Sequence, residues 1–190
     1  ITYGELFENV NRAGNALKNL NIEKGDRVLI VIKDSPEFFY VFWGAIKAGF
    51  IPVPISTLLR TKDYTFIIED SDCSVAIYSP EYADEFENAF IATKTSPEFH
   101  ICTEGEKGSL VSFMASSSGD LVAHPSTAED DCFWLYTSGS TGTPKGAVHA
   151  HKDMVITSQY YGVETLGITD KDVHYSAAKL FFAYGLGNAM

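Results

Sequence analysis

The sequence predicts an α/β fold in which a mainly parallel β-sheet is flanked by helices. Two observations predict it. Short apolar runs rich in β-branched residues alternate with helical patterns of about ten residues, and the run over 27–32 (RVLIVI) is apolar almost throughout. Alternating strands and helices are typical of crossover connections between parallel strands, and a continuous apolar run is typical of a strand covered on both faces.

The first elements follow from the spacing of apolar residues. Thr2 and Glu5 form a capping box, and apolar residues at steps of three and four then predict an amphipathic helix over 2–20. The strand over 27–32 comes next. A Ser-Pro pair then supplies a cap and a first-turn proline for a buried helix over 35–48.

The same strand and helix unit is then repeated in shape. We expect strands over 51–55, 74–78 and 99–102, and helices over 61–69 and 79–92. From 103 to 131 the pattern fades into Gly, Ser and charged residues, with one helix over 110–115. We expect a long surface connection there, and long loops of this kind are typically functional or mobile. A second sheet segment begins at Cys132, which divides the chain into an N-terminal α/β subdomain over 1–128 and the start of a second α/β subdomain over 129–190.

Composition narrows the choice of partners and compartment. The formal net charge of −11 repels nucleic acid and anionic lipid, so we expect neither as a partner. The three cysteines have no disulfide or zinc-ligand spacing, which favours buried thiols in the cytoplasm. The most apolar stretch, 38–55, is interrupted by Lys, Gly and Pro and is too broken for a membrane span. The oligomeric state cannot be read from the sequence.

Residues 133–149 read FWLYTSGSTGTPKGAVH, an apolar strand that runs into a loop of small and hydroxylated residues with one lysine. Glycines let backbone N–H groups approach an anion, hydroxyls add donors, and a lysine is a mobile charge suited to phosphate oxygens. The pattern predicts a cradle for the phosphates of a nucleotide. The candidate phosphate-binding residues are Thr137, Ser138, Gly139, Ser140, Thr141, Gly142 and Lys145.

This loop differs from the Walker loop. Lys145 follows Pro144 and precedes Gly146, and the residues after it resemble a strand rather than a helix. A flexible Gly/Ser/Thr linker is the alternative, but the solitary lysine, the rigid proline and the apolar flanks argue against it. His149 and His151 form an H-x-H pair without a third ligand nearby in sequence, so we assign no metal ligands.

Three segments carry a resemblance to a known family. Thr137–Gly146 resembles the signature loop of the adenylate-forming superfamily, which holds the AMP-binding acyl-CoA synthetases. Residues 47–54 (KAGFIPVP) resemble the early structural motif of that family, and 2–6 and 24–28 resemble its opening helix and strand. The similarity extends over essentially the whole chain. It implies part of the large N-terminal domain of an adenylate-forming enzyme.

The resemblance also implies a reaction. In this family a carboxylate attacks the α-phosphate of ATP, pyrophosphate leaves, and the thiol of coenzyme A captures the acyl adenylate. We therefore expect ATP, Mg²⁺, coenzyme A and a small-molecule carboxylic acid as cofactors and substrates. The loop would hold the β- and γ-phosphates by position and charge. None of its residues need be a nucleophile, so no catalytic residue is assigned within the chain.

Residues 179–188 (KLFFAYGLGN) occupy the place of the family's aromatic acid-pocket motif. This string, together with the Tyr-Thr-Ser-Gly-Ser loop, most resembles the benzoate- and hydroxybenzoate-CoA ligases, and Phe182 stands where many family members have a histidine. Planar side chains stack well on a planar ring. We expect Phe182 and Tyr184 to contact the acid, with Ala183 and Gly185 leaving room. Ordinary core packing of these aromatic residues is the alternative.

Two other functions remain open. Ligases for medium-chain fatty acids, coumarate or cyclohexane carboxylate share every motif except the acid-pocket details, and a non-catalytic nucleotide-binding module would keep the loop without the chemistry. The sequence begins at Ile1 and stops at Met190 inside an apolar segment, which suggests a piece cut from a longer enzyme. The family's ribose-binding aspartate, hinge and catalytic lysine have no counterpart here. We therefore expect the 190 residues alone to be inactive as a ligase.

Overall fold

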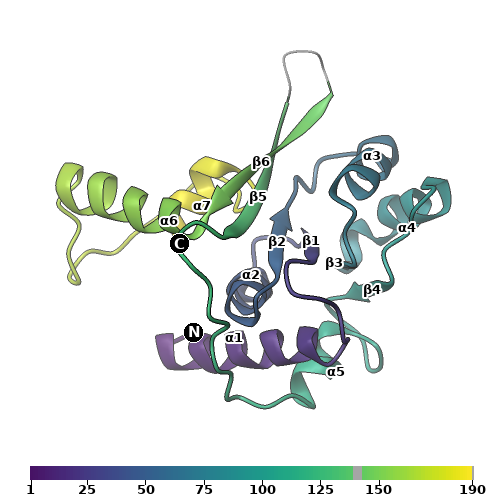
Figure 1. Cartoon of the computed structure of the whole chain (residues 1–190), viewed down its shortest axis with the longest axis horizontal. Helices are drawn as coiled ribbons and strands as arrows, with labels where there is room; N and C mark the ends of the chain where they lie inside the picture. Colours follow the sequence, from purple (N-terminus) through teal and green to yellow (C-terminus); the bar gives the residue numbers. More distant parts are fainter. Residues whose placement is uncertain (139–142, 190) are drawn as a thin grey trace.

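A four-stranded parallel sheet forms the larger sheet of the computed structural model, which describes residues 1–138 and 143–189 (Figure 1). Its strand order is β2-β1-β3-β4, so β1 lies between β2 and β3. The strands are β1 (Arg27–Val31), β2 (Ile51–Pro54), β3 (Val75–Tyr78) and β4 (Phe99–Cys102). The predicted α/β fold with a parallel sheet is confirmed.

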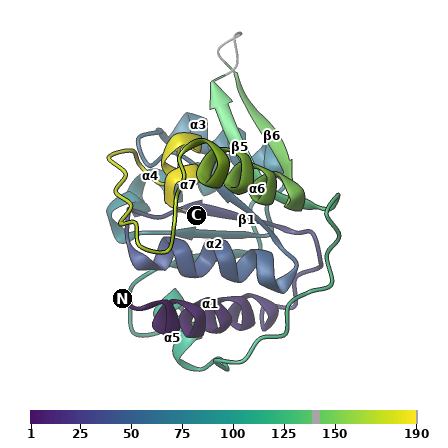
Figure 2. The ribbon, with the colours of Figure 1, turned by 90° about the vertical axis from the view of Figure 1, so that its left-hand side faces the viewer.

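Helices cover both faces of this sheet. One side carries α1, α2 and α5, and the other carries α3 and α4 (Figures 1 and 2). Their bounds are α1 (Tyr3–Lys18), α2 (Pro36–Ala48), α3 (Thr61–Ser71), the 3₁₀ turn η1 (Pro80–Tyr82), α4 (Ala83–Ala92) and α5 (Leu110–Ala115). Within 1–138 and 143–189, no helix is both long enough and apolar enough to cross a bilayer.

The strand β1 is buried on both faces, as its apolar run predicts. Val28 and Ile30 join the cluster under α2, whereas Leu29 and Val31 join the cluster under α3 and α4. All four side chains have an exposed fraction of 0%. Because its side chains enter both hydrophobic clusters, β1 joins the two helical layers, and the chain that follows its carboxyl end leaves from a fully packed strand.

The connection between α5 and the second sheet runs over the surface, as predicted, and is fastened to α1. Asn11, Arg12 and Asn15 of α1 donate hydrogen bonds of 2.7–2.9 Å to backbone carbonyls within residues 117–120. These bonds satisfy carbonyls that have no partner in a regular element. The connection therefore has a defined course despite its irregular backbone.

The second sheet is an antiparallel hairpin of β5 (Asp131–Ser138) and β6 (Pro144–Ala150). It leads into α6 (His151–Thr157), the π-helical η2 (Ser158–Thr165) and, further on, α7 (Ala183–Ala189). Cys132, Phe133 and Leu135 of β5 belong to the same hydrophobic cluster as α2, and the ring centroids of Phe42 and Phe133 are 5.6 Å apart. The hairpin thus shares the core of the first sheet, and the division at residue 128 stays a prediction.

Two glycines meet where α1 packs against α2. A Cβ added to Gly44 would lie 2.8 Å from the backbone N of Gly14 and 2.8 Å from the carbonyl O of Val10. A Cβ added to Gly14 would lie 2.7 Å from the carbonyl O of Gly44. The absence of side chains at both positions therefore sets the distance between the two helices.

Gly44→Ala should lower the free energy of unfolding by about 1–3 kcal/mol, because the added methyl group forces two backbones apart. Gly4→Ala is the matched control, since a Cβ there would meet only Thr2 Oγ1 at 3.9 Å. Alanine in an open helical position is neutral or stabilising by up to about 1 kcal/mol. Urea titrations of the full-length protein measure both. Equal stabilities for Gly44→Ala and the wild type would contradict the close helix contact.

Candidate functional site

The described part of the predicted phosphate-binding loop lies at the outer end of the β5–β6 hairpin (Figure 1). Thr137 pairs with Lys145, and Ser138 pairs with Pro144, in antiparallel register. The side chains of Thr137 and Lys145 are exposed. Residues 139–142 of the prediction lie outside the described residues. The hairpin thus brings a hydroxyl from one strand and an ammonium group from the other to the same end.

The segment after Lys145 is a strand, as the sequence predicts, rather than the helix that follows a Walker loop. A helix N-terminus would have supplied backbone N–H donors and a positive dipole end to a phosphate. Among the described residues at this end of the hairpin, the side-chain groups that could donate to an anion are the Thr137 hydroxyl and the Lys145 ammonium group. This arrangement separates the site from the common nucleotide-binding loop.

Tyr136 attaches the outer half of β5 to α3. Its hydroxyl donates a hydrogen bond of 2.6 Å to Oδ2 of Asp70. Its ring also lies across the hairpin, because a Cβ on the facing Gly146 would be 3.4 Å from the ring. Burial, and then the hydrogen bond to Asp70, raise the pKa of Tyr136, so the hydroxyl remains a donor at neutral pH. Tyr136 therefore holds the strand directly before Thr137.

Tyr136→Phe should lower the free energy of unfolding at pH 8 by about 1 kcal/mol, because a hydrogen bond from a partly buried tyrosine to an exposed carboxylate is lost. The variant should also lose less stability than the wild type between pH 8 and pH 11. In the wild type the pKa of Tyr136 is higher in the folded chain than the unfolded value of about 10. Its contribution is therefore complete below pH 10 and declines as the pH rises from there toward the folded pKa.

Urea titrations at the two pH values measure both effects. Tyr160→Phe is the control, since the Tyr160 side chain on η2 is 61% exposed. A Tyr136→Phe variant that behaved like Tyr160→Phe at both pH values would show that the bond to Asp70 contributes nothing.

The environments of His149, Cys73 and Cys132 have structural explanations. The ring of His149 stacks on Phe133 at a centroid distance of 4.6 Å, and its Nδ1 lies 3.5 Å from Oδ2 of Asp153. Burial raises the pKa of Cys73 to about 11 and that of Cys132 to about 12. Thiols with such pKa values stay protonated at neutral pH and are poor nucleophiles.

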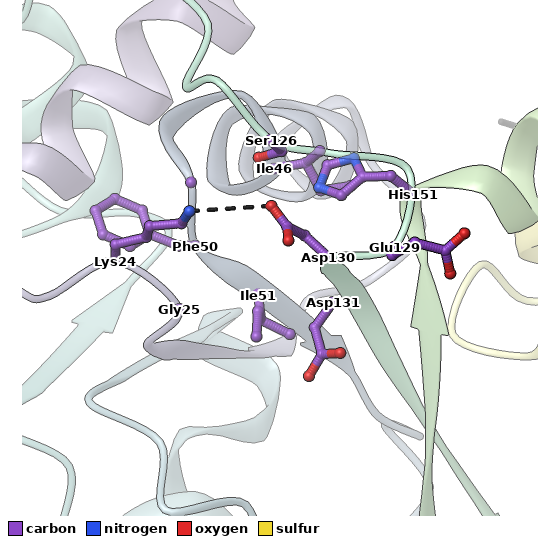
Figure 3. Close-up of a pocket in the computed structure, with 11 residues that line it drawn as sticks. Lys24, Gly25, Ile46, Phe50, Ile51, Ser126, Glu129, Asp130, Asp131 and His151 are labelled. Atoms are coloured by element: carbon purple, nitrogen blue, oxygen red, sulfur yellow. Dashed lines mark ion pairs between the residues drawn. The ribbon is translucent and has the colours of Figure 1, made fainter.

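A cavity of about 340 Å³ lies at the opposite end of the hairpin, where β5 begins (Figure 3). Glu129, Asp130 and Asp131 line it together with Lys24, whose Nζ is 4.0 Å from Oδ2 of Asp130. Hydrogen bonds from Thr127 lower the pKa of Asp130, so this carboxylate remains charged. Three carboxylates beside one lysine repel phosphate, and the strand places this cavity about 20 Å from the loop. We assign the cavity no part in nucleotide binding.

The predicted acid-contacting residues lie at the start of α7. Phe182 is 50% exposed and Tyr184 is 70% exposed, so neither is a core residue of the described chain. The neighbouring Phe181 is buried, and its ring centroid lies 4.5 Å from that of Phe182. The ring of Phe182 thus lies against a buried ring, and Ala183 and Tyr184 after it are also exposed. We call the two exposed aromatic residues, Phe182 and Tyr184, the aromatic strip.

Gly185 has a packing requirement that the sequence did not reveal. A Cβ at this position would lie 2.1 Å from the carbonyl oxygen of Lys179. The same carbonyl accepts the N–H of Phe182 at 3.1 Å, which closes a turn. Glycine is therefore needed here by the turn itself, and the predicted role of leaving room for the acid stays a prediction.

The two predicted groups of residues share a core but have no direct polar contact. Leu135 of β5 belongs to the same hydrophobic cluster as Leu180 and Leu186. Both views place α7 beside the lower part of the hairpin (Figures 1 and 2). Across residues 1–138 and 143–189, no hydrogen bond or ion pair joins Thr137 or Lys145 to residues 182–185.

A known protein family and several known proteins match this chain over its whole length. The sequence profile of the family described as "AMP-binding enzyme" matches residues 1–190. A benzoate–CoA ligase of Thauera aromatica is 45% identical over 192 residues, which cover 100% of this chain and 36% of that protein. A solved anthranilate CoA ligase in complex with anthranoyl-AMP superimposes with a TM-score of 0.93 at 35% identity, covering 99% of this chain and 37% of the other.

A ligase for a different class of acid is also similar. A long-chain-fatty-acid–CoA ligase of Mycobacterium tuberculosis is 35% identical over 154 residues, which cover 81% of this chain and 30% of that protein. The chain thus spans only about a third of the length of the relatives that it matches.

Proposed function

This chain belongs to the AMP-binding enzyme family, and we propose that the full-length protein is an ATP-dependent acid–CoA ligase for benzoate or a related aryl carboxylate. One observation favours an aryl carboxylate over other carboxylic acids as the substrate. The exposed rings of Phe182 and Tyr184 stand in a chain that is 45% identical to a benzoate–CoA ligase over its whole length. A strip of exposed planar side chains is suited to a planar substrate.

The reaction that we propose has two steps. The carboxylate of the acid attacks the α-phosphorus of ATP, the bond to the β,γ-diphosphate breaks, and pyrophosphate leaves. The thiol of coenzyme A then attacks the acyl carbon of the adenylate, loses its proton and displaces AMP. ATP enters with Mg²⁺ on its phosphates, so the metal is part of the substrate.

In this proposal the chain supplies position and charge. Thr137 and Lys145, which face each other at the outer end of the hairpin, hold the β- and γ-phosphates. The net charge of −11 opposes ATP binding at long range, so these local donors have to outweigh it at short range. The ring of the acid lies on Phe182 and Tyr184. We place the reaction in the cytoplasm, because the three cysteines are free thiols.

A fatty acid is the second candidate substrate. The observation that favours it is the 35% identity to a long-chain-fatty-acid–CoA ligase over 154 residues. An aliphatic chain gains from burial against an aromatic strip but not from ring stacking. The two candidates therefore differ in how much Phe182 and Tyr184 should contribute to binding.

Benzoate should support ATP–pyrophosphate exchange by the full-length protein, with kcat/KM about 5-fold to 150-fold above that for octanoate. The reason is that two ring contacts contribute about 0.5–1.5 kcal/mol each beyond burial of apolar area. The exchange of labelled pyrophosphate into ATP measures the adenylation step alone. A preference for octanoate would overturn the aryl assignment, whereas no exchange with any carboxylic acid would overturn the ligase itself.

Lys145→Ala in the same protein should lower kcat/KM for ATP about 100-fold, because a preorganised charge on the phosphates is lost. The melting temperature should stay unchanged, since the side chain is exposed and contributes little packing. Lys62→Ala, an exposed lysine of α3, is the control of equal charge change. If the two variants had the same kinetics, Lys145 would be removed from the site.

A further inference from the structure

One carboxylate, Asp34, joins the first sheet to the turn that precedes α7. Its Oδ1 accepts the backbone N–H of Leu180 at 3.1 Å, and its Oδ2 lies 2.9 Å from Nζ of Lys179. Asp34 and Leu180 are 146 residues apart in the sequence. The two oxygens of the carboxylate thus contact two successive residues of the turn, one residue each.

The turn that Asp34 contacts determines where the aromatic strip lies. The carbonyl of Lys179 accepts the N–H of Phe182, and the carbonyl of Phe182 accepts the N–H of Leu186 at 2.8 Å. The side chains of Leu180 and Leu186 are buried, with exposed fractions of 8% and 3%. A displacement of Leu180 would therefore move the backbone that carries Phe182.

Asp34 lies just beyond the sheet, at a position where a residue can act on a bound ligand. It follows the carboxyl end of β1, and the connections leaving β1 and β3 run in opposite directions, through α2 to β2 and through α4 to β4. In open α/β sheets, ligands bind outside the carboxyl ends of strands at such a switch point. The only charged group that Asp34 contacts within the described residues belongs to Lys179 of the turn.

From these contacts we infer that Asp34 is a positioning residue for the carboxylic acid substrate, because it holds the 179–182 turn so that Phe182 and Tyr184 face the acid. The inference rests on the proposed ligase function. Of its two contacts, the ion pair with Lys179 contributes less, since the two side chains are 37% and 56% exposed. The hydrogen bond from the Leu180 amide to a charged acceptor contributes more.

Asp34→Ala in the full-length protein should raise the KM for benzoate about tenfold and leave the KM for ATP within about twofold in ATP–pyrophosphate exchange. Asp34→Asn keeps an oxygen that can accept from Leu180, so it should restore most of the benzoate affinity. Lys33→Met is the matched control. It removes the neighbouring charge, which pairs with Glu81 at 2.7 Å and with Glu104 at 3.3 Å. Within residues 1–138 and 143–189 the Lys33 side chain makes no hydrogen bond or ion pair with the turn, so both KM values should stay unchanged.

Amide hydrogen exchange at Leu180 tests the contact without any enzyme assay. The rate should rise in Asp34→Ala and stay as in the wild type in Asp34→Asn and Lys33→Met. An unchanged KM for benzoate in Asp34→Ala, or an equal rise in the KM values for benzoate and ATP, would overturn the inference.

Two further outcomes separate the possible failures. A wild-type protein with no benzoate-dependent exchange would refute the proposed substrate, while faster Leu180 exchange in Asp34→Ala would still support the contact. If Asp34→Ala does not fold, Asp34→Asn carries the test. Retained Leu180 protection with near-normal benzoate KM would then support the inference, and lost protection with normal benzoate KM would overturn it.

Discussion

Burial of the inner half of β5 is the constraint on which the candidate site depends. Cys132, Phe133 and Leu135 pack into the cluster beneath α2, and the same strand then leaves the core so that Thr137 is exposed. Because one half of the strand is fixed, the other half has a defined direction. Leu180 lies in the same cluster, which relates the aromatic strip to the hairpin through shared packing.

Charge is distributed unevenly along this hairpin. Its inner end carries the acidic cavity with Glu129, Asp130 and Asp131, whereas its outer end carries Lys145. Coulomb interactions between exposed groups are screened within about 8–10 Å at physiological ionic strength, so the two ends act on a ligand almost independently. A protein with a strongly negative total charge can therefore still present a local site for an anion.

Sequence reasoning identified the elements of the first sheet to within two residues, because burial on both faces and Ser-Pro starts leave local signals. It also identified β6 as a strand. It missed the contacts that place these elements, namely Tyr136 with Asp70 and Asp34 with Leu180, which are 66 and 146 residues apart. No local pattern marks such pairs, since each member taken alone is an ordinary strand, helix or loop residue. The packing requirement at Gly185 was missed for a different reason: its partner Lys179 is near in sequence, but the close approach depends on the backbone path of the turn, which no residue pattern marks.

The central claim is that the outer end of the hairpin holds the phosphates of ATP while the acid lies on the aromatic strip. A crystal structure of the full-length protein with ATP and benzoate tests it most directly. The account predicts triphosphate oxygens within hydrogen-bonding distance of Thr137 and Lys145, and the benzoate ring against Phe182 and Tyr184. A triphosphate bound at any other place on the protein would contradict it.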